Sequence, residues 1–90
     1  EYQIESLTMD GSDILITVSY GGGCETHEWE LCWDGQLAES YPMQAWLDLG
    51  HNANNDTCFA LITETLRFDV SSIWATPTVL KIGDQEVLYE

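Results

Sequence analysis

The residues of this chain that could do chemistry lie in two short segments. The first reads Tyr-Gly-Gly-Gly-Cys-Glu-Thr-His from Tyr20 and carries Cys24 and His27. The second begins at His51 and ends at Cys58. Two thiols and two imidazoles form a complete ligand set for tetrahedral zinc, and two cysteines are also the partners of a disulfide. Which chemistry is open depends on whether the fold brings the two segments together.

Alternating apolar residues predict strands on both sides of these segments. The pattern indicates strands over residues 2–9, 13–20, 26–33, 43–50, 78–82 and 85–89, and the three glycines at 21–23 are expected to break the second of them. Residues 58–67 also suit a helix capped by Asp56, but their threonines and the lack of an alanine-rich surface favour a strand. We therefore expect one all-β domain over residues 1–90, a small antiparallel β-sandwich or open barrel of about seven strands.

The predicted topology would bring the chemical groups to one end of the domain. If residues 26–33 and 43–50 are antiparallel neighbours, the start of the first strand lies beside the end of the second. Cys24 and His27 then share an end with His51. The loop that leads to Cys58 starts the next strand from that same end. The four residues are therefore expected to converge.

Three states of this cluster are compatible with the sequence. A Cys24–Cys58 disulfide would close a loop of about 35 residues and stabilise the domain by roughly 4 kcal/mol. A metal centre of Cys24, His27, His51 and Cys58 could hold zinc or copper, although the spacing matches no standard zinc finger. In the third state the cysteines pack as small hydrophobic groups without bonding. The disulfide is favoured over the metal centre because it needs two correctly placed residues and the metal needs four. The role of the third cysteine, Cys32, stays open.

A cysteine nucleophile with a histidine base would be the catalytic version of the cluster. Backbone N–H groups of residues 21–23 could then form an oxyanion hole. The surrounding acidic residues would raise the pKa of the thiol, and no cationic residue is close in the sequence to stabilise a thiolate. We therefore expect no catalytic residue and no cofactor, with zinc or copper as the exception.

The charge balance restricts the partners. Sixteen acidic residues face two basic ones, Arg67 and Lys81, for a net charge of −14. Such a field repels phosphate backbones, and no apolar run is long enough to insert into a membrane. A basic protein, a divalent cation or a neutral ligand remains open. The run Asn52-x-Asn54-x-Asp56 resembles the start of a calcium loop but lacks the glycine and glutamate that complete one.

The tryptophans divide between core and surface. Trp29 and Trp33 share one face of their predicted strand with Leu31, so we expect them in the core. Trp46 points away from the apolar side of its strand. It is the better candidate for a surface that stacks on a ligand.

Three stretches resemble a group of small secreted bacterial domains and lipoproteins. They are Tyr-Gly-Gly-Gly-Cys-Glu-Thr-His-Glu-Trp-Glu-Leu from Tyr20, Leu-Gly-His-Asn-Ala-Asn-Asn-Asp-Thr-Cys from Leu49, and Leu-Arg-Phe-Asp-Val from Leu66. The resemblance covers roughly residues 14–73. It implies a β domain exported across the inner membrane, with Cys24 and Cys58 as natural partners. The extra Cys32 departs from that pattern, and the group carries no established activity.

These observations together predict the class of function. We expect an acidic extracytoplasmic domain, periplasmic or extracellular, with a lipid anchor in the full-length precursor as a further option. Its expected role is a non-enzymatic binding or structural module, and the alternative is a metal-binding protein. The chain opens at Glu1 without a signal peptide, so we expect a processed or trimmed product.

Overall fold

The computed structural model describes residues 2–90 and contains seven strands. They are β1 (Tyr2–Asp10), β2 (Asp13–Gly22), β3 (Glu28–Trp33), β4 (Met43–Asn52), β5 (Ala60–Asp69), β6 (Thr78–Ile82) and β7 (Gln85–Tyr89). The described residues contain no helix, and hence none long and apolar enough to cross a membrane. The prediction of an all-β domain is confirmed, and residues 58–67 fall largely in strand β5.

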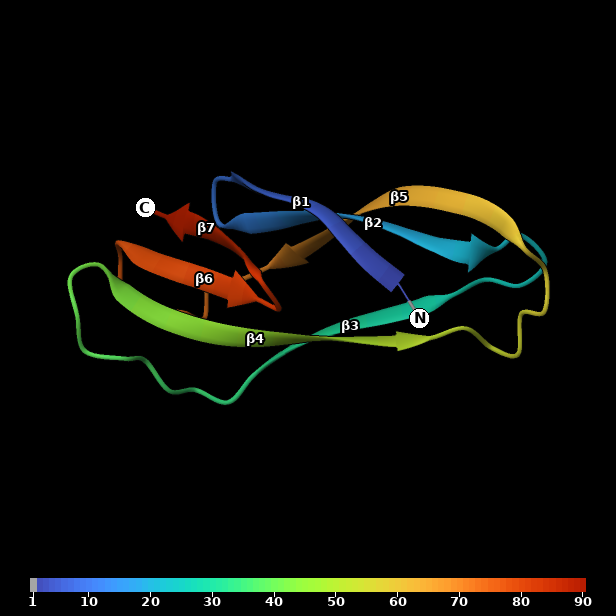
Figure 1. The fold of residues 1–90 in the computed structure, drawn as a ribbon. Coiled ribbons are helices and arrows are strands. Elements are labelled where there is room, and N and C mark those ends of the chain that lie inside the picture. Colours follow the sequence, from blue (N-terminus) through green and yellow to red (C-terminus); the bar gives the residue numbers. More distant parts are fainter. Residues whose placement is uncertain (1) are drawn as a thin grey trace.

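The strands form two sheets that pack face to face as an open sandwich (Figure 1). One sheet has the order β1-β2-β5 and is antiparallel throughout. The other has the order β3-β4-β6-β7, in which β3 and β4 are the predicted antiparallel neighbours. Its central pair, β4 and β6, is parallel because the chain leaves this sheet after β4 to form β5 in the other.

The core lies between the inner faces of the two sheets. Alternate residues of β2, β4 and β6 point inward and are buried, which is the pattern expected for strands with one solvated face. The residues of these strands that form the core are Ile14, Ile16, Val18, Tyr20, Ala45, Leu47, Leu49, Leu80 and Ile82. Trp29 and Trp33 pack against this core, whereas Trp46 is 55% exposed on the outer face. Trp29 and Trp33 are thus partly buried at the margin of the core, and the exposure expected of Trp46 is confirmed, while its stacking on a ligand stays a prediction.

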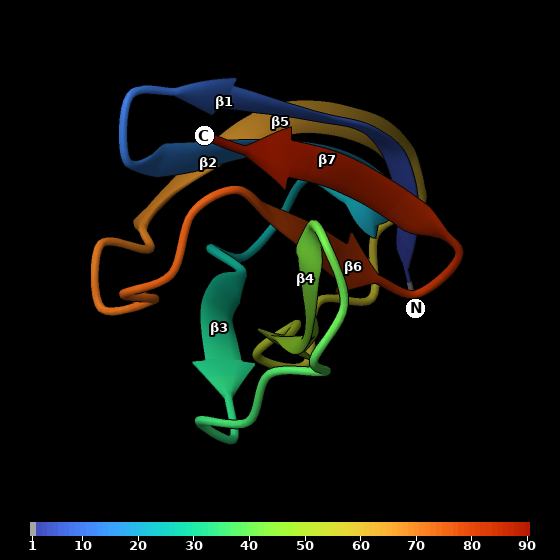
Figure 2. The same cartoon turned by 90° about the vertical axis from the view of Figure 1, so that its left-hand side faces the viewer.

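The two long sides of the sandwich differ. On one side β7 lies beside β1, so the edges of the two sheets meet (Figure 2). On the other side the sheets end in β3 and β5, and no backbone ladder joins these two strands. Their contact is a side-chain one, in which the Trp29 indole donates a hydrogen bond to Glu64 at 3.2 Å. The sandwich is therefore open along β3 and β5.

Strand β2 continues further than the sequence indicated. It runs through Gly21 and Gly22, which pair with Leu61 and Ala60 of β5. The break comes at Gly23, where φ is +116°. Only glycine adopts this backbone conformation without strain. The turn that follows leads into the bend that carries the predicted site.

Candidate functional site

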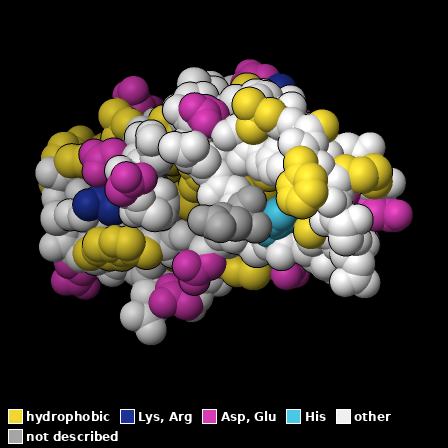
Figure 3. Space-filling model, turned by 45° about the vertical axis from the view of Figure 1, so that its right-hand side comes forward, with side chains coloured by type: hydrophobic (Ala, Val, Ile, Leu, Met, Phe, Trp, Pro, Cys, Tyr) yellow, Lys and Arg dark blue, Asp and Glu magenta, His cyan; other side chains and the backbone are white. Residues whose placement is uncertain are grey.

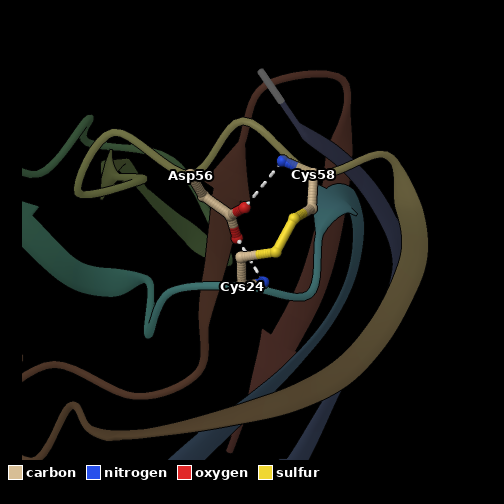
Figure 4. Close-up of side chains that lie close together, drawn as sticks. All are labelled: Cys24, Asp56 and Cys58. Atoms are coloured by element: carbon tan, nitrogen blue, oxygen red, sulfur yellow. Dashed lines mark hydrogen bonds between the residues drawn. A yellow bond between two sulfur atoms is a disulfide. The ribbon is translucent and has the colours of Figure 1, made fainter.

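A disulfide joins Cys24 to Cys58 at one end of the sandwich (Figure 4). Cys24 lies in the bend after β2, and Cys58 lies just before β5. Their Cα atoms are 5.8 Å apart, which is the usual separation for a disulfide. The pairing favoured by the sequence is therefore confirmed. Cys32 lies on β3, where it is exposed and has no disulfide partner.

The carboxylate of Asp56 accepts hydrogen bonds from two bends, the one after β2 that contains Cys24 and the one before β5 that contains Cys58. Its Oδ2 atom accepts from the backbone N–H groups of Gly23, Cys24 and Glu25 at 3.0, 3.3 and 3.2 Å. Its Oδ1 atom accepts from the N–H of Cys58 at 3.0 Å. The N–H of Cys58 has the largest effect in lowering the pKa of Asp56 far below its ordinary value. Asp56 is thus held as an anion, although its side chain is 0% exposed.

Two histidines extend this network away from the disulfide. His27 Nε2 lies 2.9 Å from Asp56 Oδ2, and His27 Nδ1 lies 2.7 Å from His51 Nε2. Because the carboxylate can only accept, His27 donates from Nε2. With both rings neutral, His51 then donates from Nε2 to His27 Nδ1. We assign these tautomers from the network. Burial is the largest cause that lowers the pKa of His51, and this favours its neutral form.

Aromatic rings enclose the two imidazoles. Trp29 stacks on His51 with a centroid separation of 4.0 Å and an interplanar angle of 12°. Tyr20 lies against His27 at 4.4 Å, and Tyr2 meets His51 edge-on at 5.5 Å. These contacts bring β1, β2, β3 and β4 together around one pair of rings. His51 is consequently fixed in position by its neighbours as well as by its hydrogen bond.

A second carboxylate, Glu64, closes the cluster from β5. Its Oε1 atom accepts hydrogen bonds from the Tyr20 hydroxyl at 2.7 Å and from Trp29 Nε1 at 3.2 Å. Burial, reinforced by this carboxylate, raises the pKa of Tyr20 to about 12. Glu64 occupies an inward position of β5, where the pattern of residues 58–67 otherwise has apolar side chains. It faces inward because it accepts these two bonds.

The close approach of Asp56 and His27 explains the glycine at position 22. A Cβ atom on Gly22 would lie 2.7 Å from Asp56 Oδ2 and 2.8 Å from His27 Nε2. Both distances are shorter than a side-chain carbon tolerates. A Cβ atom on Gly21, one residue earlier, would meet no atom within 4 Å. Within the glycine run, position 22 therefore needs glycine because a Cβ atom has no space there. Position 23 needs glycine for its backbone conformation.

The structure brings together all four residues that the sequence singled out, but not as free ligands. The sulfurs of Cys24 and Cys58 are bonded to each other, and both ring nitrogens of His27 are engaged. Among residues 2–90, the group of side chains whose ligand atoms lie within 4.8 Å of one another is Cys24, Asp56 and Cys58, and it includes neither histidine. Zinc or copper binding by the Cys24, His27, His51 and Cys58 set stays a prediction.

Sequence reasoning gave Asp56 no place in this cluster. The sequence offered it as a helix cap and as one position of an incomplete calcium loop, whereas its side chain points inward and is fully buried. Asn54, the preceding position of that pattern, donates a hydrogen bond to the carbonyl of Thr26 at 2.6 Å. The usable signal was the Asp-x-Cys spacing, because an Asp side chain commonly bonds the N–H two residues on.

Comparisons with protein-family models, with curated proteins and with solved structures found no match. The fold and the site define a class, a small disulfide-linked all-β sandwich with a buried carboxylate–imidazole network. The resemblance to secreted bacterial domains stays a prediction.

We predict that Gly22→Ala destabilises the protein and that Gly21→Ala does not. The new methyl group at position 22 must displace the Asp56–His27 pair, at a cost of about 1–3 kcal/mol. At position 21 it meets open space, so the change is expected within about 0.5 kcal/mol. Urea unfolding of the two variants measures the difference. Equal stability of the two variants would show that a methyl group at position 22 does not disturb the Asp56–His27 pair.

Proposed function

We propose that this chain is an acidic, non-enzymatic binding module that works outside the cytoplasm. The observation that carries the proposal is the Cys24–Cys58 disulfide, which ties the two ends of the candidate site. Structural disulfides persist in oxidising compartments and are rare in the cytosol. The periplasm or the exterior of a bacterial cell is the location we propose, with a lipid anchor in the precursor.

A structural role for the buried cluster supports the non-enzymatic part of the proposal. A general base or nucleophile must present a lone pair to its substrate. Asp56 is fully buried, and its two oxygens accept from N–H groups of this chain, while His27 uses both ring nitrogens within the cluster. These groups are occupied in holding two bends together. Binding is then assigned to the outer surface of the sandwich.

The surface charge favours a basic protein as partner. Acidic side chains are spread over the face in Figure 3 rather than gathered at one point. Arg67, one of the two basic residues, is already paired with Asp10 and Asp13 at 3.0 and 2.8 Å. A net charge of −14 accelerates encounters with a positively charged partner and repels acidic ones.

The state of the cysteines in the cells that make the protein tests the proposal. After acid quenching and maleimide labelling, we expect one adduct per chain, on Cys32, and three adducts if the protein is reduced first. The Cys32→Ser variant is the control and should take no label without reduction. Three adducts without reduction would place the working protein in a reducing compartment and refute the proposal.

Metal binding is the second candidate function. It is favoured by one observation, the proximity of the Cys24 and Cys58 sulfurs to a carboxylate oxygen of Asp56 within 4.8 Å. Reduction would free two thiols close to Asp56, and His27 and His51 complete the predicted ligand set. Zinc or copper would suit such a set.

Equilibrium dialysis against zinc separates the two candidates. If metal binding is the function, reduced protein should take up one zinc per chain and the Cys58→Ser variant should not. His51→Gln should weaken the uptake, whereas Cys32→Ser is the matched control and should leave it unchanged. Failure of the reduced protein to bind zinc would eliminate this candidate.

A further inference from the structure

Of the four sheet edges in residues 2–90, three are protected against pairing with another strand. Strand β1 has an irregular register between Ile4 and Ser6 and lies beside β7, which has five residues. Strand β3 has six residues and presents the charged side chains of Glu28 and Glu30 outward. Short length, irregular register and outward charge are the usual devices that prevent edge-to-edge association.

Strand β5 is neither short nor irregular, and its outward charges, Arg67 and Asp69, lie near its end. Its ten residues pair with β2 in continuous register, from Ala60 with Gly22 to Asp69 with Asp13. It contains no proline, no glycine and no lysine. Along its other edge, every second residue directs its N–H and C=O groups away from β2. No strand of residues 2–90 pairs with those groups. The edge therefore has the length and regularity to accept one more strand.

A cavity opens beside this edge, on the open side of the sandwich. It measures about 240 Å³ and is lined mainly by apolar side chains, among them Leu31 and Trp33 of β3, Phe68 of β5 and Ile73. Sites for whole small molecules usually measure roughly 300–1,000 Å³. This cavity is below that range and suits a side chain. An added strand would direct alternate side chains toward it, since successive residues of a strand point to opposite faces.

The first residues of β5 and the residue before it add apolar contact area. Phe59 is 97% exposed and Leu61 is 79% exposed, although both are large apolar side chains. They stand two residues apart in the chain, so in an extended chain they project to the same side. Apolar groups of this kind on an otherwise acidic surface are typical of a contact with another protein.

Charge decides between a second copy of this chain and a different partner. Two copies would bring together net charges of −14. Antiparallel pairing of β5 with its own copy about Glu64 would also set two carboxylates opposite each other, which is destabilising. A positively charged segment is instead attracted by the net negative charge of the chain.

From the free edge, the cavity and the charge we propose that β5 binds an extended basic segment of a partner protein. The segment adds a fourth strand to the sheet β1-β2-β5 and places one apolar side chain in the cavity next to Phe68. Backbone hydrogen bonds supply the affinity and the cavity supplies the selectivity, as in other cases of strand addition. This inference rests on the proposed binding function and names its partner and surface.

A synthetic peptide of about ten residues, in which lysine alternates with valine and one central valine is leucine, tests the inference. Binding should protect the backbone amides of alternate β5 residues from hydrogen exchange. It should also slow alkylation of Cys32, which lines the cavity and is exposed in the free protein. Both effects should be absent with the matching peptide that has glutamate in place of lysine.

Two N-methylated peptides separate strand addition from attraction by charge alone. Methylation at the lysines blocks the N–H groups of one peptide edge, and methylation at the valines blocks those of the other. One of the two should lose binding and the other should keep it, because only one edge faces β5. An equal response, whether both are retained or both are lost, would overturn the inference.

Two variants with the same change in charge locate the contact. Thr65→Lys places a cation on the outer face of β5 and should weaken peptide binding about fivefold or more. Thr8→Lys makes the same change on β1, two strands away, and should have little effect. Equal weakening would contradict the inference, as would a dimer of the free protein that Thr65→Lys dissolves.

The result distinguishes this inference from the proposed function. Amide protection confined to the sheet β3-β4-β6-β7 would overturn the assignment to β5 while supporting a binding module. Absence of peptide binding would overturn the inference, and the count of cysteine adducts would still decide the compartment.

Discussion

One buried carboxylate holds the disulfide end of this protein together. An ionised group inside a protein is stable only if hydrogen bonds replace its lost water. Asp56 obtains four backbone N–H groups and one imidazole, and these donors come from both bends. The chain around residues 23–25 is thereby wrapped about the side chain of a residue more than thirty positions later. The disulfide adds a covalent link at the place where this carboxylate holds the bends together.

This arrangement divides the molecule into a rigid end and an accessible side. At the rigid end, the imidazoles of His27 and His51 lie among aromatic rings and share one chain of hydrogen bonds with Asp56. The accessible side is the long side of the sandwich where the edge strands β3 and β5 do not pair with each other. Because β5 starts two residues after Cys58, the bonds at the rigid end also fix the first residues of the free edge. Stability at the first location thus supports the strand addition that we propose at the second.

Much of the fold and part of the site followed from the sequence. Strict alternation predicted the strands, and the antiparallel pairing of residues 26–33 with 43–50 placed Cys24, His27, His51 and Cys58 at one end. The parallel pairing of β4 with β6 was not predictable, since it depends on β5 belonging to the other sheet. Asp56 was missed because it is one of sixteen acidic residues. It also lies in a loop, where the alternation of a strand does not indicate which side chains are buried. The buried state of a carboxylate becomes visible only when its donors, far away in sequence, are in place.

The ionisation of Asp56 is the most direct test of this account. Its pKa is lowered in the folded protein, so its contribution to stability is complete above its ordinary value of 3.8 and is lost as the pH falls toward the folded value. The carboxyl carbon of Asp56 can be followed by NMR while the pH of the folded, oxidised protein is decreased. The account predicts that this signal shows no protonation near pH 3.8 while exposed carboxyl groups titrate. A midpoint near 3.8 for Asp56 would contradict it.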